Sequence, residues 1–374
     1  MRKSSRSLQR LPRPIELSGV LKARVVKASA PMRVDCGGTW DLVPFALTRQ
    51  SWEPATVNVA LDLRVQVRLA PFLRGHVRIQ VNEDEGYVFC YDDLSISGHL
   101  ALPIAILAHF NVAGLDVRIS SPVPAGSGLG GSGALAVTLV SALASAAGLV
   151  DFRPPMSRRH TAVLAHRLED GLRLSMTGLQ DQLAAAYGGA NLWGWTYGRE
   201  TTLFKRQSVI RSRDIDRASS SFLVAHTGST RPSMVTSAKY VDSFLRGSSS
   251  KQWHAINALT HAFARALRDG AWVRAAHLLR QAQELRTEVL ADEVLEKDQP
   301  FLQQATLHGC GAAFGGGNTG GCVWAVGEPR AISRLRAVWS VLAGTPECVG
   351  VGAARITATG LCSFVGRDES VTDQ

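Results

Sequence analysis

A glycine-rich stretch near the middle of the chain constrains the fold more than any other feature. Residues 122–134 read Pro-Val-Pro-Ala-Gly-Ser-Gly-Leu-Gly-Gly-Ser-Gly-Ala, with five glycines between Gly126 and Gly133. Glycine adopts positive φ at little steric cost and lets the backbone approach a ligand closely. Residues 115–120 before the stretch alternate as in a strand, and an alanine-rich apolar run after it predicts a helix over about 133–147. A glycine-rich turn that enters a helix presents free N–H groups to an anion, most often a phosphate.

Alternating segments elsewhere predict further strands. Residues 60–69 and 76–81 place apolar side chains on one face and polar side chains on the other, which is typical of antiparallel strands with one covered face. A last strand is expected near 354–359. Helices are expected where apolar residues recur at helical spacing, at residues 101–110, 157–172 and most of 251–308. Because strands and helices mix without strict β-α alternation, we expect an α+β fold and not a doubly wound one.

The length and local composition predict two domains. The 374 residues suit two domains of ordinary size. Residues 206–220 are polar and basic, as in an interdomain connection, so the expected domains are 19–205 and 206–374. Residues 1–18 are basic and carry two prolines, which predicts a disordered leader.

Composition excludes several function classes. No uncharged apolar run reaches the roughly 18–20 residues of a membrane span, and no apolar core follows the basic N-terminus as in a signal peptide. We therefore expect a cytoplasmic protein without a membrane partner. The six cysteines are scattered without a C-x-x-C pair, which favours reduced thiols over disulfides or a zinc site. The net charge of +10 is concentrated near the N-terminus, so we expect an anionic small-molecule substrate and no nucleic acid.

The better-known phosphate loops do not fit the glycine stretch. A P-loop needs a lysine before its hydroxyl residue, but Gly131 precedes Ser132 here. Residues 126–131 satisfy G-x-G-x-x-G, yet Pro122 and Pro124 separate them from the preceding strand and no repeated β-α-β unit surrounds them. The H-R-D and D-F-G companions of a protein kinase are absent from the sequence.

The full pattern Pro124-x-x-x-Gly128-Leu129-Gly130-x-Ser132-x-Ala134 resembles the phosphate loop of the GHMP kinases, P-x-x-x-G-L-G-S-S-A. Gly131 replaces the first serine of that loop, and Ser132 matches the second.

Three further stretches resemble the family in the expected order. Residues 33–41 resemble the R-x-x-x-x-G-G-x-x-D motif of the sugar-kinase branch that includes fucokinase and the heptose 7-phosphate kinases, with Arg33 and Asp41 one residue closer. Residues 178–189 resemble the G-x-x-D-Q-x-A-A-x-x-G-G of the same branch. Residues 309–321 resemble the C-terminal glycine motif, interrupted by Asn318 and Thr319.

The resemblance implies an N-terminal mixed or antiparallel sheet with helices, a C-terminal ferredoxin-like α/β sandwich, and a kinase that uses ATP and Mg²⁺. It implies that Asp181 accepts the substrate proton, Arg33 assists catalysis, and Ser132 and Glu169 hold the metal. The implied nucleotide-binding residues are Pro124, Gly126, Ser127, Gly128, Leu129, Gly130, Gly131 and Ser132. The implied substrate-binding residues are Gly38, Asp41, Gly316 and Gly317.

Simpler structural roles stay open for the polar residues. Ser132 can be an N-cap, Glu169 a solvated helix residue, Asp181 a helix-start carboxylate, and Asp41 a turn residue that bonds local backbone. The function we expect is transfer of a γ-phosphoryl group to a sugar or sugar phosphate. A kinase of a non-sugar alcohol and a non-catalytic ATP- and sugar-binding sensor are the alternatives, and both a monomer and a homodimer are open.

Overall fold

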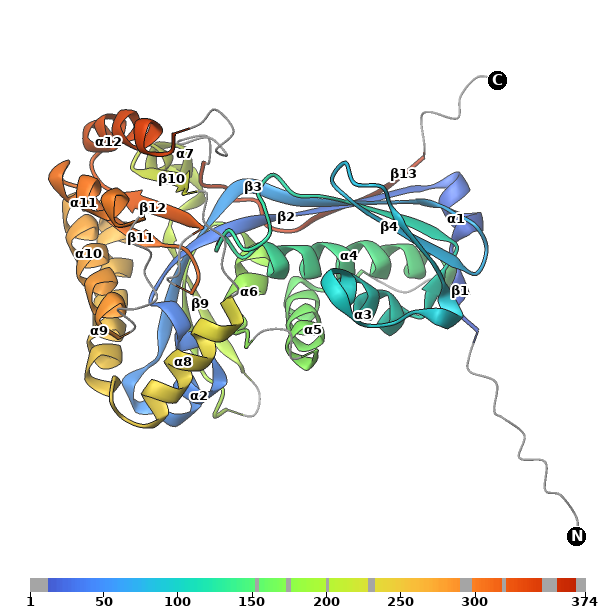
Figure 1. Ribbon diagram of the computed structural model, residues 1–374, viewed down its shortest axis with the longest axis horizontal. Helices are drawn as coiled ribbons and strands as arrows, with labels where there is room; N and C mark the ends of the chain where they lie inside the picture. The colour runs from blue at the N-terminus through green and yellow to red at the C-terminus, as the bar shows by residue number, and fades with distance from the viewer. Residues whose placement is uncertain are drawn as a thin grey trace, which may run out of the picture.

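Two long strands, β2 (Val25–Cys36) and β3 (Ala55–Pro71), run through most of the protein in this computed structural model (Figure 1). They pair antiparallel along nearly their whole length. The structure describes residues 13–151, 155–172, 176–199, 202–227, 233–289, 298–317, 321–344 and 355–367. The strand expected at residues 60–69 is part of β3, which begins five residues earlier, at Ala55.

The larger sheet is built around β2 and β3 in the order β13-β2-β3-β7-β4-β5. Its other strands are β4 (His76–Val81), β5 (Tyr87–Cys90), β7 (Leu115–Ser120), β8 (Ala190–Trp195), β9 (Phe204–Ile210) and β13 (Cys362–Gly366). The first part of β3 pairs with β8, which pairs in turn with β9, and the last part of β3 pairs with β7. The β4–β7 pair is parallel, so the alternating pattern that suggested antiparallel strands belongs to a mixed sheet.

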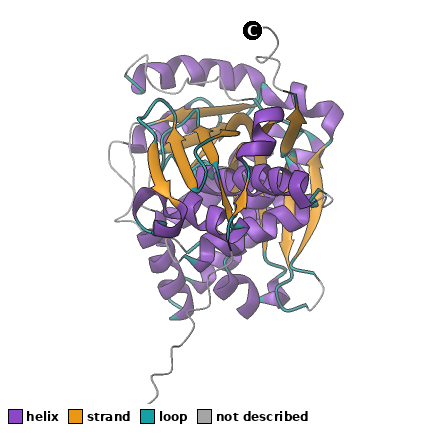
Figure 2. Ribbon diagram, turned by 90° about the vertical axis from the view of Figure 1, so that its right-hand side faces the viewer, coloured by secondary structure: helices purple, strands orange, loops and turns teal. Residues whose placement is uncertain are grey.

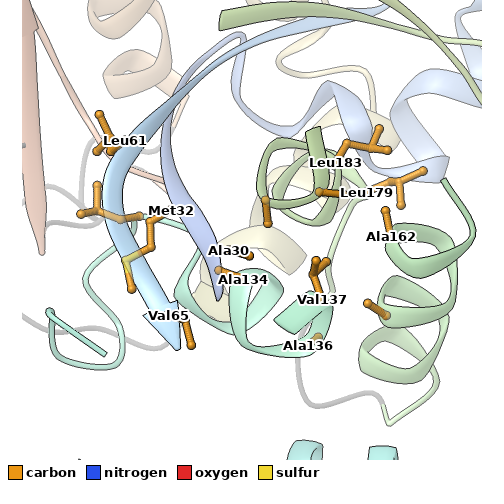
Figure 3. Packing of buried hydrophobic residues seen from close by; sticks show 14 of the residues in the cluster. Ala30, Met32, Leu61, Val65, Ala134, Ala136, Val137, Ala162, Leu179 and Leu183 are labelled. Atoms are coloured by element: carbon orange, nitrogen blue, oxygen red, sulfur yellow. The ribbon is translucent and has the colours of Figure 1, made fainter. Parts of the chain in front are cut away.

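Helix α4 (Gly131–Asp151) follows the glycine stretch and packs against this sheet. Figure 3 shows Ala134 of α4 beside Ala30 of β2, and Ala136 and Val137 on the side of α4 toward Ala162 of the next helix in the chain. All five side chains are buried. Small side chains on both elements let the helix lie close to the strands without voids.

The remaining helices of this layer lie on the same side of the sheet as α4 (Figure 1). They are α3 (Ala101–Phe110), α5 (Arg158–Gly171) and α6 (Gln180–Tyr187). Within the described ranges, α4 alone is long and apolar enough to cross a membrane, but 67% of its most apolar window is buried inside the protein. It is the central helix of the core.

A second, smaller sheet has the antiparallel order β10-β12-β11. Its strands are β10 (Phe222–His226), β11 (Gly311–Phe314) and β12 (Cys322–Val326). The helices that follow β9 in the chain are α7 (Ile215–Ser219), α8 (Ser233–Leu245), α9 (Ser250–Asp269), α10 (Trp272–Val289), α11 (Gln299–Leu307) and α12 (Pro329–Leu342). Of these, α10, α11 and α12 contact the smaller sheet. The shorter elements of the chain are β1 (Ile15–Glu16), β6 (Val112–Ala113), α1 (Ser18–Ala23) and α2 (Val43–Thr48). Helices pack beside both sheets (Figure 2), and the expected α+β class is confirmed.

Several expected boundaries differ from the structure. The division between residues 205 and 206 falls inside β9, which belongs to the larger sheet through β8. The last strand is β13 and not 354–359, where Ile356 forms only an isolated bridge to Leu61. Because β13 pairs with β2, the end of the chain returns to the first sheet. Of the expected leader, residues 1–12 lie outside the described residues, while Ile15–Glu16 pairs with β6. These differences arise from long-range strand pairing, which local composition does not encode.

Candidate active site

The glycine stretch forms one wall of a cavity of about 530 Å³ between β7 and the start of α4. Gly126, Gly128 and Gly130 have φ of 78°, 79° and 71°, a conformation that favours glycine. Seven of the eight expected nucleotide-binding residues line this cavity: Pro124, Gly126, Ser127, Gly128, Gly130, Gly131 and Ser132. The N-terminus of α4 therefore opens onto the same space, where its free N–H groups favour an anion.

Leu129 differs from the other expected nucleotide-binding residues. Its side chain is 0% exposed and belongs to the apolar core. Its carbonyl oxygen accepts a hydrogen bond of 2.9 Å from the backbone N–H of Arg33. Leu129 thus anchors the glycine loop to β2, and it contributes no side chain to the cavity.

Arg33 and Asp181 meet at the cavity directly beside Gly130. Arg33 Nε donates to Asp181 Oδ1 at 2.8 Å, and Arg33 Nη1 donates to the Gly128 carbonyl at 2.6 Å. A Cβ on Gly130 would lie 3.2 Å from the Asp181 carboxylate. The Asp181 side chain keeps 23% exposure while that of Arg33 keeps 5%. The pair is held by the protein on one side and open to the cavity on the other.

The electrostatics of this pair suit proton transfer. Burial raises the pKa of the Asp181 carboxyl above its ordinary value, and the Arg33 guanidinium limits that rise. Burial by itself would lower the pKa of Arg33, but the carboxylates of Asp181 and Asp35 raise it above its ordinary value. Arg33 therefore stays charged, and Asp181 is more basic than a solvated aspartate.

Ser132 and Glu169 form a second polar pair in the cavity wall. Glu169 on α5 is 3% exposed, and it accepts hydrogen bonds from the Ser132 hydroxyl and, at 2.7 Å, from Gln182 Nε2. Burial raises the pKa of Glu169 to about 7, because these neutral donors compensate its charge only in part. Glu169 is thus a buried residue and not a solvated one.

This pair fits a magnesium ion. A hydroxyl and a carboxylate are hard oxygen donors, and Mg²⁺ usually binds one or two carboxylates together with substrate phosphates and waters. Among the described residues, no group of three or more His, Cys, Asp or Glu side chains is arranged to hold a metal ion by itself. A site made by Ser132 and Glu169 therefore needs phosphate oxygens to complete it.

The expected substrate residues divide into two groups. Gly316 and Gly317 line the cavity next to the glycine loop. Asp41 is 3% exposed and lies behind the cavity wall, where its two oxygens accept from the backbone N–H (3.2 Å) and Nε2 (3.1 Å) of Gln180. The same Nε2 donates to the carbonyl of Gly38 at 3.1 Å. Gly38 and Asp41 are therefore held together by Gln180.

The start of α6 explains how these groups are brought together. Gln180 bonds Asp41, Asp181 bonds Arg33, and Gln182 bonds Glu169. Gln180 and Gln182 were not expected to have a role, although Gln182 follows Asp181 in the motif at 178–189. Asp35 was also missed: it is 1% exposed and lies 3.3 Å from Arg33 Nη1. Side chains two residues apart on a strand point to the same face. A carboxylate two residues after an arginine on one strand is therefore the sequence signal that marks Asp35.

Comparison with known proteins bears on the family and the fold of the chain. Residues 100–189 match the family described as the GHMP kinases N terminal domain. A mevalonate kinase of Pyrococcus horikoshii is 26% identical over 182 residues, which cover 44% of this chain and 50% of the relative. The chain thus aligns with about half the length of that relative.

Solved structures show the same fold over nearly the whole chain. A D-glycero-D-manno-heptose 1-phosphate kinase from Bacteriodes thetaiotaomicron has a TM-score of 0.69 and 20% identity, covering 91% of this chain and 98% of its own. Lactococcus lactis galactokinase in complex with galactose has a TM-score of 0.67 and 15% identity, covering 90% of this chain and 95% of its own. Residues 100–189 therefore match a GHMP kinase N-terminal domain, and the chain as a whole has the fold of these solved kinases.

Proposed function

We propose that this protein is a phosphotransferase that moves the γ-phosphoryl group of ATP to a hydroxyl of a sugar or sugar phosphate. The observation that carries the proposal is the Asp181 carboxylate, which is paired with Arg33 and open to the cavity beside the glycine loop. A carboxylate with a raised pKa, next to a phosphate-binding loop and an arginine, has the chemistry that phosphoryl transfer to an alcohol requires.

In the proposed reaction, Asp181 accepts the proton of the acceptor hydroxyl. The acceptor oxygen forms a bond to the γ-phosphorus as the bond from that phosphorus to the bridging oxygen of ADP breaks. Arg33 stays protonated because carboxylates surround it, so it stabilises the negative charge of the transferred group. The N–H groups of the glycine loop and the N-terminus of α4 offset the charge of the phosphates.

Ser132 and Glu169 would hold Mg²⁺ in this reaction. The ion, when bound, neutralises part of the phosphate charge. Gln182 keeps Glu169 oriented toward Ser132 through its hydrogen bond.

Two observations favour different acceptors. The likeness to heptose 1-phosphate kinase and galactokinase covers at least 90% of this chain and supports a sugar or sugar phosphate. The relative that matches by sequence is a mevalonate kinase, which supports a non-sugar alcohol as the second candidate. We favour the sugar, because the motifs at 33–41 and 178–189 resemble the sugar-kinase branch.

A transfer assay separates these candidates. Purified protein is incubated with radiolabelled ATP, Mg²⁺ and single acceptors: fucose, galactose, mannose, heptose 7-phosphate and mevalonate. We expect label on at least one sugar or sugar phosphate, and none with the Asp181→Asn variant. Label on mevalonate alone would favour the second candidate. Binding of ATP and a sugar without transfer would favour a sensor.

The location and assembly of the protein are separate predictions. A cytoplasmic location without nucleic-acid or membrane partners stays a prediction. The choice between a monomer and a homodimer is tested by light scattering at several concentrations.

A further inference from the structure

The two glycine loops of the cavity touch each other through their backbones. A Cβ on Gly128 would lie 2.8 Å from the carbonyl oxygen of Gly315, and a Cβ on Gly315 would lie 2.7 Å from the carbonyl oxygen of Gly128. No side chain fits between them at these distances. The position of the Gly315–Gly317 segment therefore decides how closely it approaches the glycine loop and how wide the cavity is at this end.

Gly316 is held from two sides by buried charged residues. Asp35 Oδ1 on β2 accepts a hydrogen bond of 3.2 Å from the Gly316 N–H. Arg286 Nη2 on α10 donates to the Gly316 carbonyl oxygen. Asp35 is 1% exposed and Arg286 is 2% exposed. The two residues come from parts of the chain that belong to different sheets, and Gly316 is the point where they meet.

The same contacts reach the glycine loop through Arg33. Arg33 Nη1 lies 3.3 Å from Asp35 Oδ1 and donates to the Gly128 carbonyl at 2.6 Å. Polar contacts therefore run without interruption from Gly128 through Arg33 and Asp35 to Gly316 and Arg286. Because Arg33, Asp35 and Arg286 are all buried, solvent screens their charges weakly.

Stability by itself does not account for Asp35 and Arg286. Within the described part of the chain, Asp35 Oδ2 and Arg286 Nε are buried without a hydrogen-bond partner. Buried polar atoms without partners cost free energy, and well-packed apolar residues of similar volume often stabilise a core as well or better. Neither residue is among those that line the cavity, so neither is arranged to touch a nucleotide there directly.

We propose that Asp35 and Arg286 are positioning residues that hold the Gly315–Gly317 segment against the glycine loop and so shape the phosphate end of the cavity. This rests on the proposed function, in which that end of the cavity binds the phosphates of ATP. Among the described residues, Arg286 donates to Gly316, whereas Asp35 contacts both Gly316 and Arg33.

The test compares nucleotides that differ only in their phosphates. Dissociation constants for ATP, ADP, AMP and adenosine are measured by calorimetry on wild-type protein and on Arg286→Met, Arg286→Lys and Asp35→Asn. Arg286→Met removes a hydrogen bond from a charged group to the Gly315–Gly317 segment, so we expect it to bind ATP at least about tenfold more weakly. Adenosine and AMP should bind nearly as to wild type. Arg286→Lys keeps a cationic donor and should recover most of the loss.

Matched controls separate positioning from general destabilisation. Arg280→Met changes an arginine on the same helix that is 36% exposed and faces Glu284, and it should leave all four affinities unchanged. Asp35→Asn keeps the side-chain volume, so it tests the proposal even if Arg286→Met fails to fold. We expect Asp35→Asn to weaken the binding of ATP more than the binding of AMP.

The outcomes distinguish the two proposals. Suppose that the wild type transfers phosphate and binds ATP, but the ratio of ATP to AMP affinity is unchanged in Arg286→Met and Asp35→Asn. That result would overturn the positioning role alone. Equal weakening of adenosine and ATP would overturn it as well, because a purely structural defect has that effect. Absence of ATP binding by the wild type would overturn the proposed function, and the positioning role with it.

Discussion

Arg33 and Asp181 are 148 residues apart in the chain and are joined through a single carboxylate oxygen. Arg33 Nε lies 2.8 Å and Nη2 lies 2.6 Å from Asp181 Oδ1. The other oxygen, Oδ2, faces Gly130, whose added Cβ would lie 3.2 Å from it. The guanidinium thus fixes the orientation of the carboxylate through Oδ1, and Oδ2 is the oxygen that Arg33 does not bind.

The first prediction concerns Asp181 as the base. Asp181→Asn keeps the shape of the side chain but removes its basicity, so we expect kcat to fall by about 10²- to 10⁴-fold. ATP affinity should stay near that of wild type, since the glycine loop is unchanged. Steady-state kinetics and calorimetry measure both quantities. A variant with full activity would contradict the assignment.

The second prediction concerns the metal pair. Glu169→Gln removes the buried carboxylate that pairs with Ser132, so half-maximal activity should require at least about tenfold more Mg²⁺. Mg²⁺-dependent ATP binding, measured by calorimetry, should weaken in parallel. Asp170→Asn is the matched control, because Asp170 is the exposed neighbour on the same helix. If both variants respond to Mg²⁺ like wild type, Glu169 is not a ligand.

The third prediction concerns the pH dependence of stability. Burial raises the pKa of Asp41 to about 8, and the nearby Asp181 carboxylate adds to the rise. An unfolded aspartate titrates near about 3.9, so between these values the folded protein keeps a proton that the unfolded chain releases. The stability contributed by Asp41 is complete below about pH 4 and is lost as the pH rises toward 8.

The Asp41→Asn variant isolates this effect. Asparagine does not titrate. As the pH rises from about 5 to 7, the free energy of unfolding of Asp41→Asn should therefore increase relative to that of wild type by about 1.4 kcal/mol per pH unit. Any constant penalty from its amide group facing Gln180 does not change that slope. Urea unfolding at several pH values measures it, with the exposed Asp84→Asn as a control for the lost charge. Parallel stability curves for Asp41→Asn and wild type would rule out the buried proton.

The fourth prediction concerns the contact between α4 and α6. A Cβ on Gly133 would lie 2.7 Å from the Cβ of Asp181, so Gly133→Ala has to push the start of α6 away from the glycine loop. We expect a destabilisation of about 1–3 kcal/mol and a lower kcat, because Asp181 is displaced.

Gly171→Ala is the control for Gly133→Ala. It places a Cβ where nothing lies within 4 Å, so its free energy of unfolding should change little or improve. Thermal unfolding together with steady-state kinetics compares the two variants. A Gly133→Ala protein as stable and active as Gly171→Ala would show that the two helices do not require this close approach.

Local sequence was sufficient where local conformation carries the function. The positive φ of Gly126, Gly128 and Gly130 and the helix that follows are short-range properties, so the glycine loop was predictable from its own residues. The expected strands at 76–81 and 115–120 and the helix at 101–110 have the bounds of β4, β7 and α3. The placement of Asp181 and Glu169 came from resemblance of short motifs, and the structure brings both to the cavity.

Contacts between distant segments account for what could not be predicted. The pairing of β13 with β2 and the membership of β9 in the larger sheet depend on which strands meet, and a strand pattern does not name its partner. Asp41 is covered by Gln180, which hydrogen-bonds to it from a segment 139 residues later in the chain. A carboxylate in a glycine turn has the same local sequence whether it faces substrate or is covered by another side chain.

The sequence by itself therefore determined the glycine loop, the α+β class and the polar residues that line the cavity, because backbone conformation and hydrophobic periodicity are local. Only the tertiary structure decided that Leu129 is buried, that Arg33 binds one oxygen of Asp181, and that Gly316 lies between Asp35 and Arg286. The physical reason is that buried charges take their partners from whichever chain segments the core brings together, and those partners are remote in sequence.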